Sequence, residues 1–291
     1  MRGTRYRWPA LVLLLVTMSV IVWTLRIQQH QQHQEAGLAG RLKQINGVGS
    51  EAAVSCSEVA ASRPLVLLAL GQSNAANHGS PERAVREPIM LIADGRCIRA
   101  VDPLPGGTGI GGSIWRRLPD ALRSAGIEQP IVISILAVDA SSINEWTRQE
   151  SALRQRLVEH LASLRGLRLL PDFVLWQQGE ADAIAGTSSS DYAQQLDRLA
   201  AIVDQAGAKA PIIVARSTIC RSAPSQAVRS AIEAKASTDR RFRLGPDTDV
   251  LAGSRFRHDE CHLSADGLDA ASRMWATALA VEVARTPMPP Q

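Results

Sequence analysis

The chain has 291 residues, of which 45% are hydrophobic and 21% charged, a composition typical of a globular protein with enough apolar residues for a core. The formal net charge is only +4 and the basic residues are scattered, so no basic stripe indicates a nucleic-acid groove. Two short clusters, Arg240–Arg243 and Arg255–Arg257, fit a solvated surface better than a site for an anionic ligand. Composition and charge therefore exclude nucleic acid as the expected partner.

Residues 9–25 are apolar and uncharged, and their length is near the minimum for a bilayer span. Three arginines lie within residues 1–8, which favours a cytoplasmic N-terminus and export of the remaining chain. We expect a transmembrane signal-anchor that tethers an exported domain to the membrane. The alternative is a cleaved signal peptide and a secreted protein, with the small residues near 36–39 as the cleavage site.

Residues 26–61 are polar, rich in glutamine and without a strand pattern, which is typical of a stalk. His30 and His33 fit this spacer better than a metal site. We expect residues 286–291, at the other end of the chain, to form a loose tail.

From residue 62 to residue 285, short apolar runs alternate with segments of helical periodicity. The runs, rich in Val, Ile and Leu, are residues 64–70, 88–94, 130–138, 172–178 and 211–217. The helix candidates are residues 113–126, 145–166, 190–207, 225–237 and 264–285, the last with Ser264 as its N-cap. This alternation predicts one α/β domain, a three-layer α/β/α sandwich around a mainly parallel sheet.

Ligands of open parallel sheets bind beyond the carboxyl ends of the strands. Ser73 follows the first run, Asp139 the third, Gln178 and Glu180 the fourth, and Cys220 the last. We therefore expect these residues to lie on one rim of the sheet.

A serine nucleophile needs a general base, and the chain has six histidines. His30 and His33 belong to the predicted stalk, and His160 is expected on the surface of a helix. Three candidates remain: His78, His258 and His262.

His262 alone has a carboxylate at a suggestive spacing, that of Asp259. Residues i and i+3 of a turn lie on one side, so the carboxylate can reach Nδ1 and leave Nε2 facing outward. Two alternatives stay open at this point. The pair could cap the following helix, or Asp259 could cap locally and leave His258 as the functional histidine.

Backbone N–H groups of the glycine-rich stretch 106–112, which leads to the helix cap Ser113, could stabilise an oxyanion. A flexible loop is the competing interpretation. The side-chain amide of Gln178 is a further candidate donor, and Glu180 could orient it.

Three segments in this order carry a resemblance: G-Q-S-N at 71–74, W-Q-Q-G-E-A-D at 176–182 and D-E-C-H-L at 259–263. Together they resemble the SGNH hydrolase superfamily, and most closely its sialate O-acetylesterase branch, which includes acetylxylan esterases. The resemblance covers roughly residues 62–285. It implies a flavodoxin-like sheet and a serine esterase that removes O-acetyl groups from carbohydrate without a metal or an organic cofactor.

The resemblance also implies roles for single residues. Ser73 matches the nucleophile, His262 the base and Asp259 its partner. The oxyanion hole would comprise the N–H groups of Ser73 and Gly112 and the amide of Gln178, with Gly109 and Gly111 as equal alternatives to Gly112. Asn74 and Glu180 would support the site or contact substrate. Many members carry Gly-Pro-Glu where this chain has Gly111-Gly112-Ser113, which bears on substrate contacts.

The four cysteines have no C-x-x-C spacing, so two disulfides fit an exported protein better than a zinc site. Four cysteines allow three connectivities. We expect Cys220–Cys261 and Cys56–Cys97, because Cys220 follows a strand on the predicted rim and Cys261 lies between Asp259 and His262. The first bridge would hold the loop of the base beside the site.

Two further functions remain open. An acetyltransferase with the same triad would pass the acyl group to an exported polysaccharide instead of water. A non-catalytic glycan-binding domain would use the same fold, but it would not require the three segments to be intact.

Overall fold

The computed structural model describes residues 35–80 and 87–285, together with residues 16, 18 and 23. The chain divides into two compact units, residues 1–40 and residues 41–291. Of the first unit, residues 35–40 are helical. The second unit contains all the strands named below.

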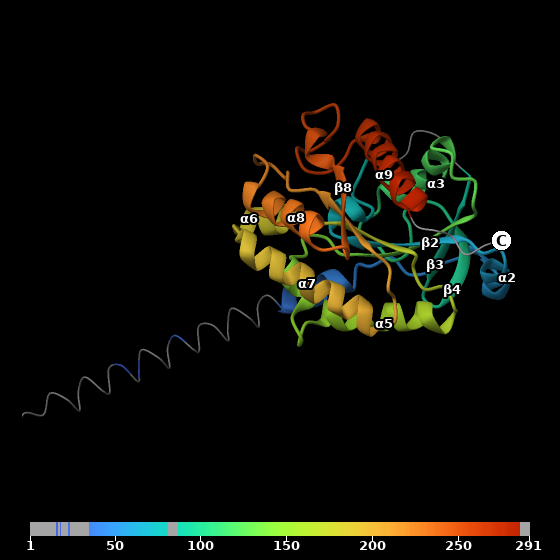
Figure 1. The fold of residues 1–291 in the computed structure, drawn as a ribbon, viewed down its shortest axis with the longest axis horizontal. Helices are drawn as coiled ribbons and strands as arrows, with labels where there is room; N and C mark the ends of the chain where they lie inside the picture. Colours follow the sequence, from blue (N-terminus) through green and yellow to red (C-terminus); the bar gives the residue numbers. More distant parts are fainter. Residues whose placement is uncertain (1–15, 17, 19–22, 24–34, 81–86, 286–291) are drawn as a thin grey trace, which may run out of the picture. The chain divides into compact units, whose positions relative to one another are not determined.

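An eight-stranded sheet forms the centre of the second unit (Figure 1). In spatial order its strands are β1 (Ala52–Val54), β4 (Arg96–Ala100), β3 (Ile89–Ala93), β5 (Ile131–Ala137), β2 (Leu65–Gly71), β6 (Phe173–Gln177), β7 (Ile212–Arg216) and β8 (Phe242–Asp247). The pairs from β3 to β8 are parallel, whereas β4 pairs antiparallel with both β1 and β3. The sheet is therefore mixed, and its antiparallel part lies at one edge.

Helices flank both faces of this sheet. They are α2 (Cys56–Ala61), α3 (Ile114–Ser124), α4 (Ile143–Thr147), α5 (Ala152–Gly166), α6 (Glu180–Ala185), α7 (Ser189–Gln205), α8 (Gln226–Thr238) and α9 (Ala265–Arg285). Figure 1 shows α3 and α9 on one side of the strands and α5, α7 and α8 on the other. The arrangement is an α/β sandwich.

The central strand β2 shows why the apolar runs form this sheet. Leu65, Leu67 and Ala69 pack into the core beneath α3 and α9. Val66 and Leu68 point to the opposite face, because side chains alternate along a strand, and they are also buried. A strand covered on both faces needs apolar residues at every position, which is the pattern that identified it in the sequence.

The predicted helices form, with one difference. The segment 145–166 is divided into α4 and α5. Ser142 and Glu145 form a capping box that begins α4, and a second cap at Ser151 begins α5 after an extended residue at Arg148. Each cap satisfies N–H groups at a helix start, so the two serines favour two helices over one. The predicted cap of α9 is present, since Ser264 Oγ accepts the N–H of Gly267 at 3.1 Å.

Residues 52–61, which the sequence assigned to the stalk, form β1 and α2. β1 joins the sheet by pairing with β4, and the disulfide Cys56–Cys97 connects α2 to β4, as expected. Part of the predicted spacer therefore belongs to the folded domain.

The predicted membrane span at residues 9–25 lies outside the described residues except at positions 16, 18 and 23. No helix in the described part of the chain is long and apolar enough to cross a bilayer.

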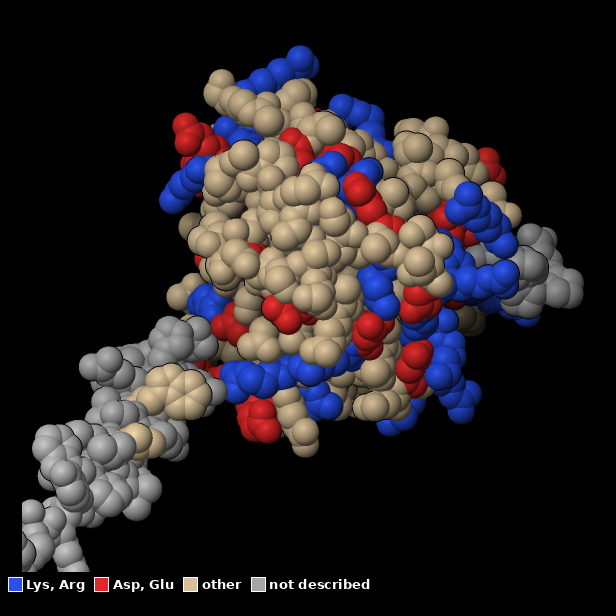
Figure 2. Space-filling view, turned by 60° about the vertical axis from the view of Figure 1, so that its left-hand side comes forward, with Lys and Arg blue, Asp and Glu red and all other residues tan. Residues whose placement is uncertain are grey.

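On the face shown in Figure 2, basic and acidic side chains are interspersed along the margins of a broad uncharged area.

Candidate active site

Ser73 lies directly beyond the carboxyl end of β2, at the start of the short 3₁₀ helix η1 (Ser73–Ala75). Gly71 makes this turn possible: its φ is +151°, and a Cβ there would lie 2.0 Å from the carbonyl oxygen of Gln177 on β6. Ser73 is 2% exposed. The turn is fixed from the other side, because the indole N–H of Trp115 donates to Ala75 O at 2.7 Å.

Asp259 and His262 form the pair that their spacing predicted. His262 Nδ1 lies 2.8 Å from Asp259 Oδ2, and Asp259 Oδ1 accepts the backbone N–H groups of Cys261 at 3.0 Å and His262 at 2.6 Å. Burial alone would raise the pKa of Asp259, but the hydrogen bonds from His262 and Cys261 hold it well below its usual range. Asp259 therefore stays ionised, holds Nδ1 as the protonated ring nitrogen and leaves Nε2 as the basic one.

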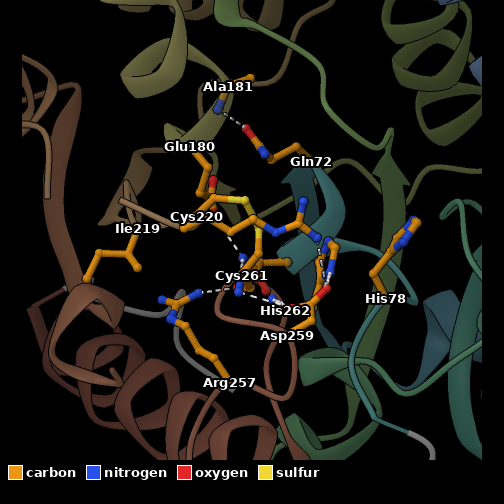
Figure 3. Close-up of a disulfide and its surroundings, with 12 residues drawn as sticks. Gln72, His78, Glu180, Ala181, Ile219, Cys220, Arg257, Asp259, Cys261 and His262 are labelled. Carbon is orange, nitrogen blue, oxygen red and sulfur yellow. Dashed lines mark hydrogen bonds and ion pairs between the residues drawn. A yellow bond between two sulfur atoms is a disulfide. The ribbon is translucent and has the colours of Figure 1, made fainter. Parts of the chain in front are cut away.

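The disulfide Cys220–Cys261 fixes the loop of this pair, as expected from the sequence (Figure 3). Arg257 holds the same loop from beneath. Its guanidinium donates to Leu251 O at 2.8 Å, to Thr248 O at 3.0 Å and to Cys261 O. Arg257 is 2% exposed, so it is not part of the solvated cluster that the sequence suggested. Burial lowers the pKa of this guanidinium, against the opposing effect of nearby carboxylates.

Asn74 connects the segment of Ser73 to this loop. Its amide Nδ2 donates to Glu180 Oε1 at 2.7 Å and lies 3.3 Å from Cys261 O. Ser217 Oγ donates to the same Glu180 oxygen at 2.8 Å. Burial raises the pKa of Glu180 to about 7, although the bonds from Asn74 and Ser217 oppose that rise. Three predicted rim segments therefore meet in one buried network.

Gln178 belongs to a neighbouring network that fully occupies its amide. Nε2 donates to Asp182 Oδ2 at 2.6 Å and to Ser141 O at 2.9 Å, and Gln72 Oε1 lies 3.3 Å away. The two hydrogens of the amide are thus committed, and no N–H is free for the predicted oxyanion role. Gln178 instead holds together the loops that follow β5 and β6.

In the glycine stretch, two of the three backbone N–H groups that were candidate oxyanion donors bond within the fold. The N–H of Gly112 donates to Gly79 O at 2.9 Å and that of Gly111 to Asn77 O at 2.7 Å, so neither is free for an oxyanion. Among the three candidate glycines, Gly109 is the one whose N–H meets no acceptor within the described residues. Its φ is +87°, and a Cβ there would lie 2.7 Å from the ring of His78.

Two further histidines flank His262. The ring of His78 stacks on it with centroids 5.3 Å apart, and that of His258 with centroids 6.0 Å apart. His78 Nε2 lies 3.1 Å from Thr108 Oγ1, a contact that no sequence spacing indicated.

His160 was expected on the surface, but it is half-buried, and its Nε2 lies 2.8 Å from Ser134 Oγ.

The arrangement thus consists of a serine at a strand end, a carboxylate–histidine pair on an anchored loop and a buried amide that joins the two segments. The sequence model of one family, described as carbohydrate esterase, sialic acid-specific acetylesterase, matches residues 64–281, the region that contains all of these groups. The chain belongs to this family. It is an SGNH-type esterase, a hydrolase of carboxylic ester bonds.

Solved structures similar to this esterase agree in fold. A protein from Arabidopsis thaliana is 19% identical with a TM-score of 0.60, and the alignment covers 75% of this chain and 98% of that one. The psychrotrophic esterase EstA from Pseudoalteromonas sp. is 13% identical with a TM-score of 0.50, over 76% of this chain and 99% of that one. No curated protein matches the esterase by sequence.

Proposed function

We propose that this esterase removes O-acetyl groups from carbohydrate, with Ser73 as nucleophile, His262 as general base and Asp259 as its orienting partner. The observation that carries the proposal is the 2.8 Å contact between His262 Nδ1 and Asp259 Oδ2 on a loop that Asn74 ties to the segment of Ser73. The substrate class is supported by the family to which the chain belongs.

In the acylation step, Nε2 of His262 accepts the hydroxyl proton of Ser73 while Oγ attacks the acetyl carbonyl. A tetrahedral oxyanion forms and then collapses, the bond to the sugar oxygen breaks, and that oxygen takes the proton from His262. In the second step, His262 deprotonates a water molecule that attacks the acetyl-serine. Acetate leaves and Ser73 recovers its proton. Asp259 stabilises the imidazolium that forms in both steps.

The oxyanion would be stabilised by the backbone N–H of Ser73 and that of Gly109. This assignment follows from the committed bonds of Gly111, Gly112 and Gln178, which leave Gly109 as the available donor among the three candidate glycines. One such donor contributes roughly a hundred- to a thousand-fold in rate.

The test is acetate release from acetylated mono- and oligosaccharides by the full chain and two matched pairs of variants. Ser73→Ala is compared with Ser237→Ala, a change at an exposed serine, and His262→Ala with His258→Ala. We expect release to fall by several orders of magnitude in the first member of each pair alone. Wild-type release in Ser73→Ala would overturn the proposal. Acetyl transfer to an added sugar that outpaces release would identify an acetyltransferase.

For location, we propose that residues 9–25 anchor the protein and that the catalytic domain is exported. The two disulfides support an oxidising compartment. Alkylation of fractionated cells tests this directly, because both pairs should resist thiol labelling unless first reduced. Labelling of all four cysteines without reduction would contradict export.

A further inference from the structure

A cluster of three residues, His78, Asp139 and His262, lies at the edge of the proposed catalytic group. One potential ligand atom of each lies within 4.8 Å of those of the other two. The residues come from separate segments: His78 follows η1, Asp139 follows β5 and His262 precedes α9. All three are half-buried. We call this the His–Asp–His cluster.

Two imidazoles and one carboxylate are a donor set that suits a borderline cation such as Zn²⁺ better than Mg²⁺ or Ca²⁺, which prefer oxygen ligands. Three protein ligands also leave a fourth position for water. The ligand atoms of a tetrahedral zinc ion lie about 3.4 Å apart, so donors that are now within 4.8 Å of one another would have to move closer together on binding.

The groups around the cluster resemble the outer partners of a zinc site. Histidines that bind a metal through one nitrogen usually give the other to a carboxylate or a comparable group, which fixes the ring. Asp259 fills this position for His262, because it binds Nδ1 and leaves Nε2. Thr108 contacts Nε2 of His78 at 3.1 Å and accepts the backbone N–H of Asp139 at 2.9 Å, so one hydroxyl holds two of the three segments.

A second combination of residues, His258, Asp259 and His262, also brings its ligand atoms within 4.8 Å. It fits a metal less well, because the Asp259 carboxylate already binds the imidazole of His262 and accepts two backbone N–H groups. His258 is also exposed. The His–Asp–His cluster leaves the pair of Asp259 and His262 intact.

A cation has a route to the cluster. A cavity of about 400 Å³ is lined by residues 77–80, 109–111 and His258, and His78 forms part of its wall. Ile110 at its rim is 89% exposed, so the cavity reaches the protein surface.

We propose that His78, Asp139 and His262 bind Zn²⁺ reversibly and that the bound ion inhibits the esterase. The inhibition rests on the proposed function, because a metal on Nε2 of His262 occupies the lone pair that must accept the proton of Ser73. Zinc binding itself does not depend on that function. No bond is made or broken in the protein, and removal of the ion restores the base.

The binding test measures competition between the disulfide-bonded full chain and a chromogenic zinc chelator. Wild type and Ser73→Ala should each bind one equivalent of Zn²⁺ in competition with the chelator and with equal affinity, since Ser73 is not a ligand. His78→Asn and Asp139→Asn should each weaken binding at least about tenfold, because loss of a direct ligand costs no less than loss of an outer partner. Unchanged affinity in both variants would overturn the site.

The activity test follows p-nitrophenyl acetate hydrolysis against ZnCl₂, with EDTA to reverse the effect. His78→Asn should need at least about tenfold more zinc than wild type for half-inhibition, with each protein measured against its own zinc-free rate. His258→Asn, the matched control, should be inhibited like wild type. Loss of zinc sensitivity in His258→Asn alone would place the ion on the second combination and contradict the proposal. An enzyme that binds zinc but hydrolyses no ester would refute the proposed function instead.

Discussion

Asn74, the residue after Ser73, places its amide Nδ2 3.3 Å from the carbonyl oxygen of Cys261, the residue before His262. One side chain therefore connects the nucleophile segment to the base loop. The same amide also donates to the buried Glu180 at 2.7 Å, which fixes its position. A short path of this kind fixes two groups that are far apart in sequence with little freedom between them.

Removal of this amide should impair catalysis more than folding. We expect Asn74→Ala to lower kcat roughly a hundred-fold with little change in KM, since a displacement of about 1 Å between reacting groups costs that much. The labelling rate of Ser73 by a fluorophosphonate should fall in parallel. Asn144→Ala, at an exposed position of α4, is the control. An unchanged kcat with a lowered melting temperature would assign Asn74 a purely structural role.

The carboxylate of Asp259 should determine which nitrogen of His262 is basic. In Asp259→Asn the new amide can donate to Nδ1, which would place the ring proton on Nε2 and remove the base. We expect kcat to fall roughly 10³- to 10⁴-fold, the effect typical of a triad that loses its acid. Glu260→Gln, one residue further along and exposed, should leave kcat unchanged. Equal kcat values for the two variants would exclude the proposed role of Asp259.

The buried Glu180 should make stability depend on pH in a defined direction. Its pKa is about 7 in the folded protein against an ordinary 4.5, so folding favours the protonated form. Its contribution is therefore complete below pH 4.5 and is lost as the pH rises through 7, by on the order of 3 kcal/mol.

Glu180→Gln keeps the acceptor oxygen for Asn74 and Ser217 but cannot ionise. Urea unfolding of both proteins between pH 4.5 and pH 8 tests the expectation, since the stability of the variant relative to wild type should increase over this range. A constant difference would show that Glu180 does not titrate there.

The two disulfides provide a matched comparison, because each joins cysteines 41 positions apart. Loss of either crosslink should therefore destabilise the fold by a similar amount, about 4 kcal/mol from chain entropy. Only the pair Cys220→Ser and Cys261→Ser should also lower kcat at a temperature where all variants are folded, since Cys261 lies within the base loop. An equal loss of kcat in the variant without Cys56 and Cys97 would contradict this assignment.

The strands that the sequence predicted are those buried on both faces, such as β2 and β6, because every position must then be apolar. β4 was missed because it is short and its exposed arginines, Arg96 and Arg99, lie three residues apart, so it shows neither a continuous apolar run nor strict alternation. β1 is shorter still and mostly exposed, so only its partner β4 defines it.

In the site, Asp259 and His262 could be predicted because three residues of one turn determine their contact. The donors of the glycine loop could not, since Gly112 is bound by a bridge to Gly79 that forms only when distant segments pack. The same holds for Arg257, a charged residue whose burial depends on three carbonyl groups that the fold brings together.

Fluorophosphonate labelling followed by peptide mass spectrometry measures whether His262 activates Ser73. We expect one adduct on Ser73 of the wild-type protein, none in Ser73→Ala, a strongly slowed reaction in His262→Ala and a normal rate in His258→Ala. An adduct on another residue, or labelling of Ser73 at an equal rate in His262→Ala, would contradict it.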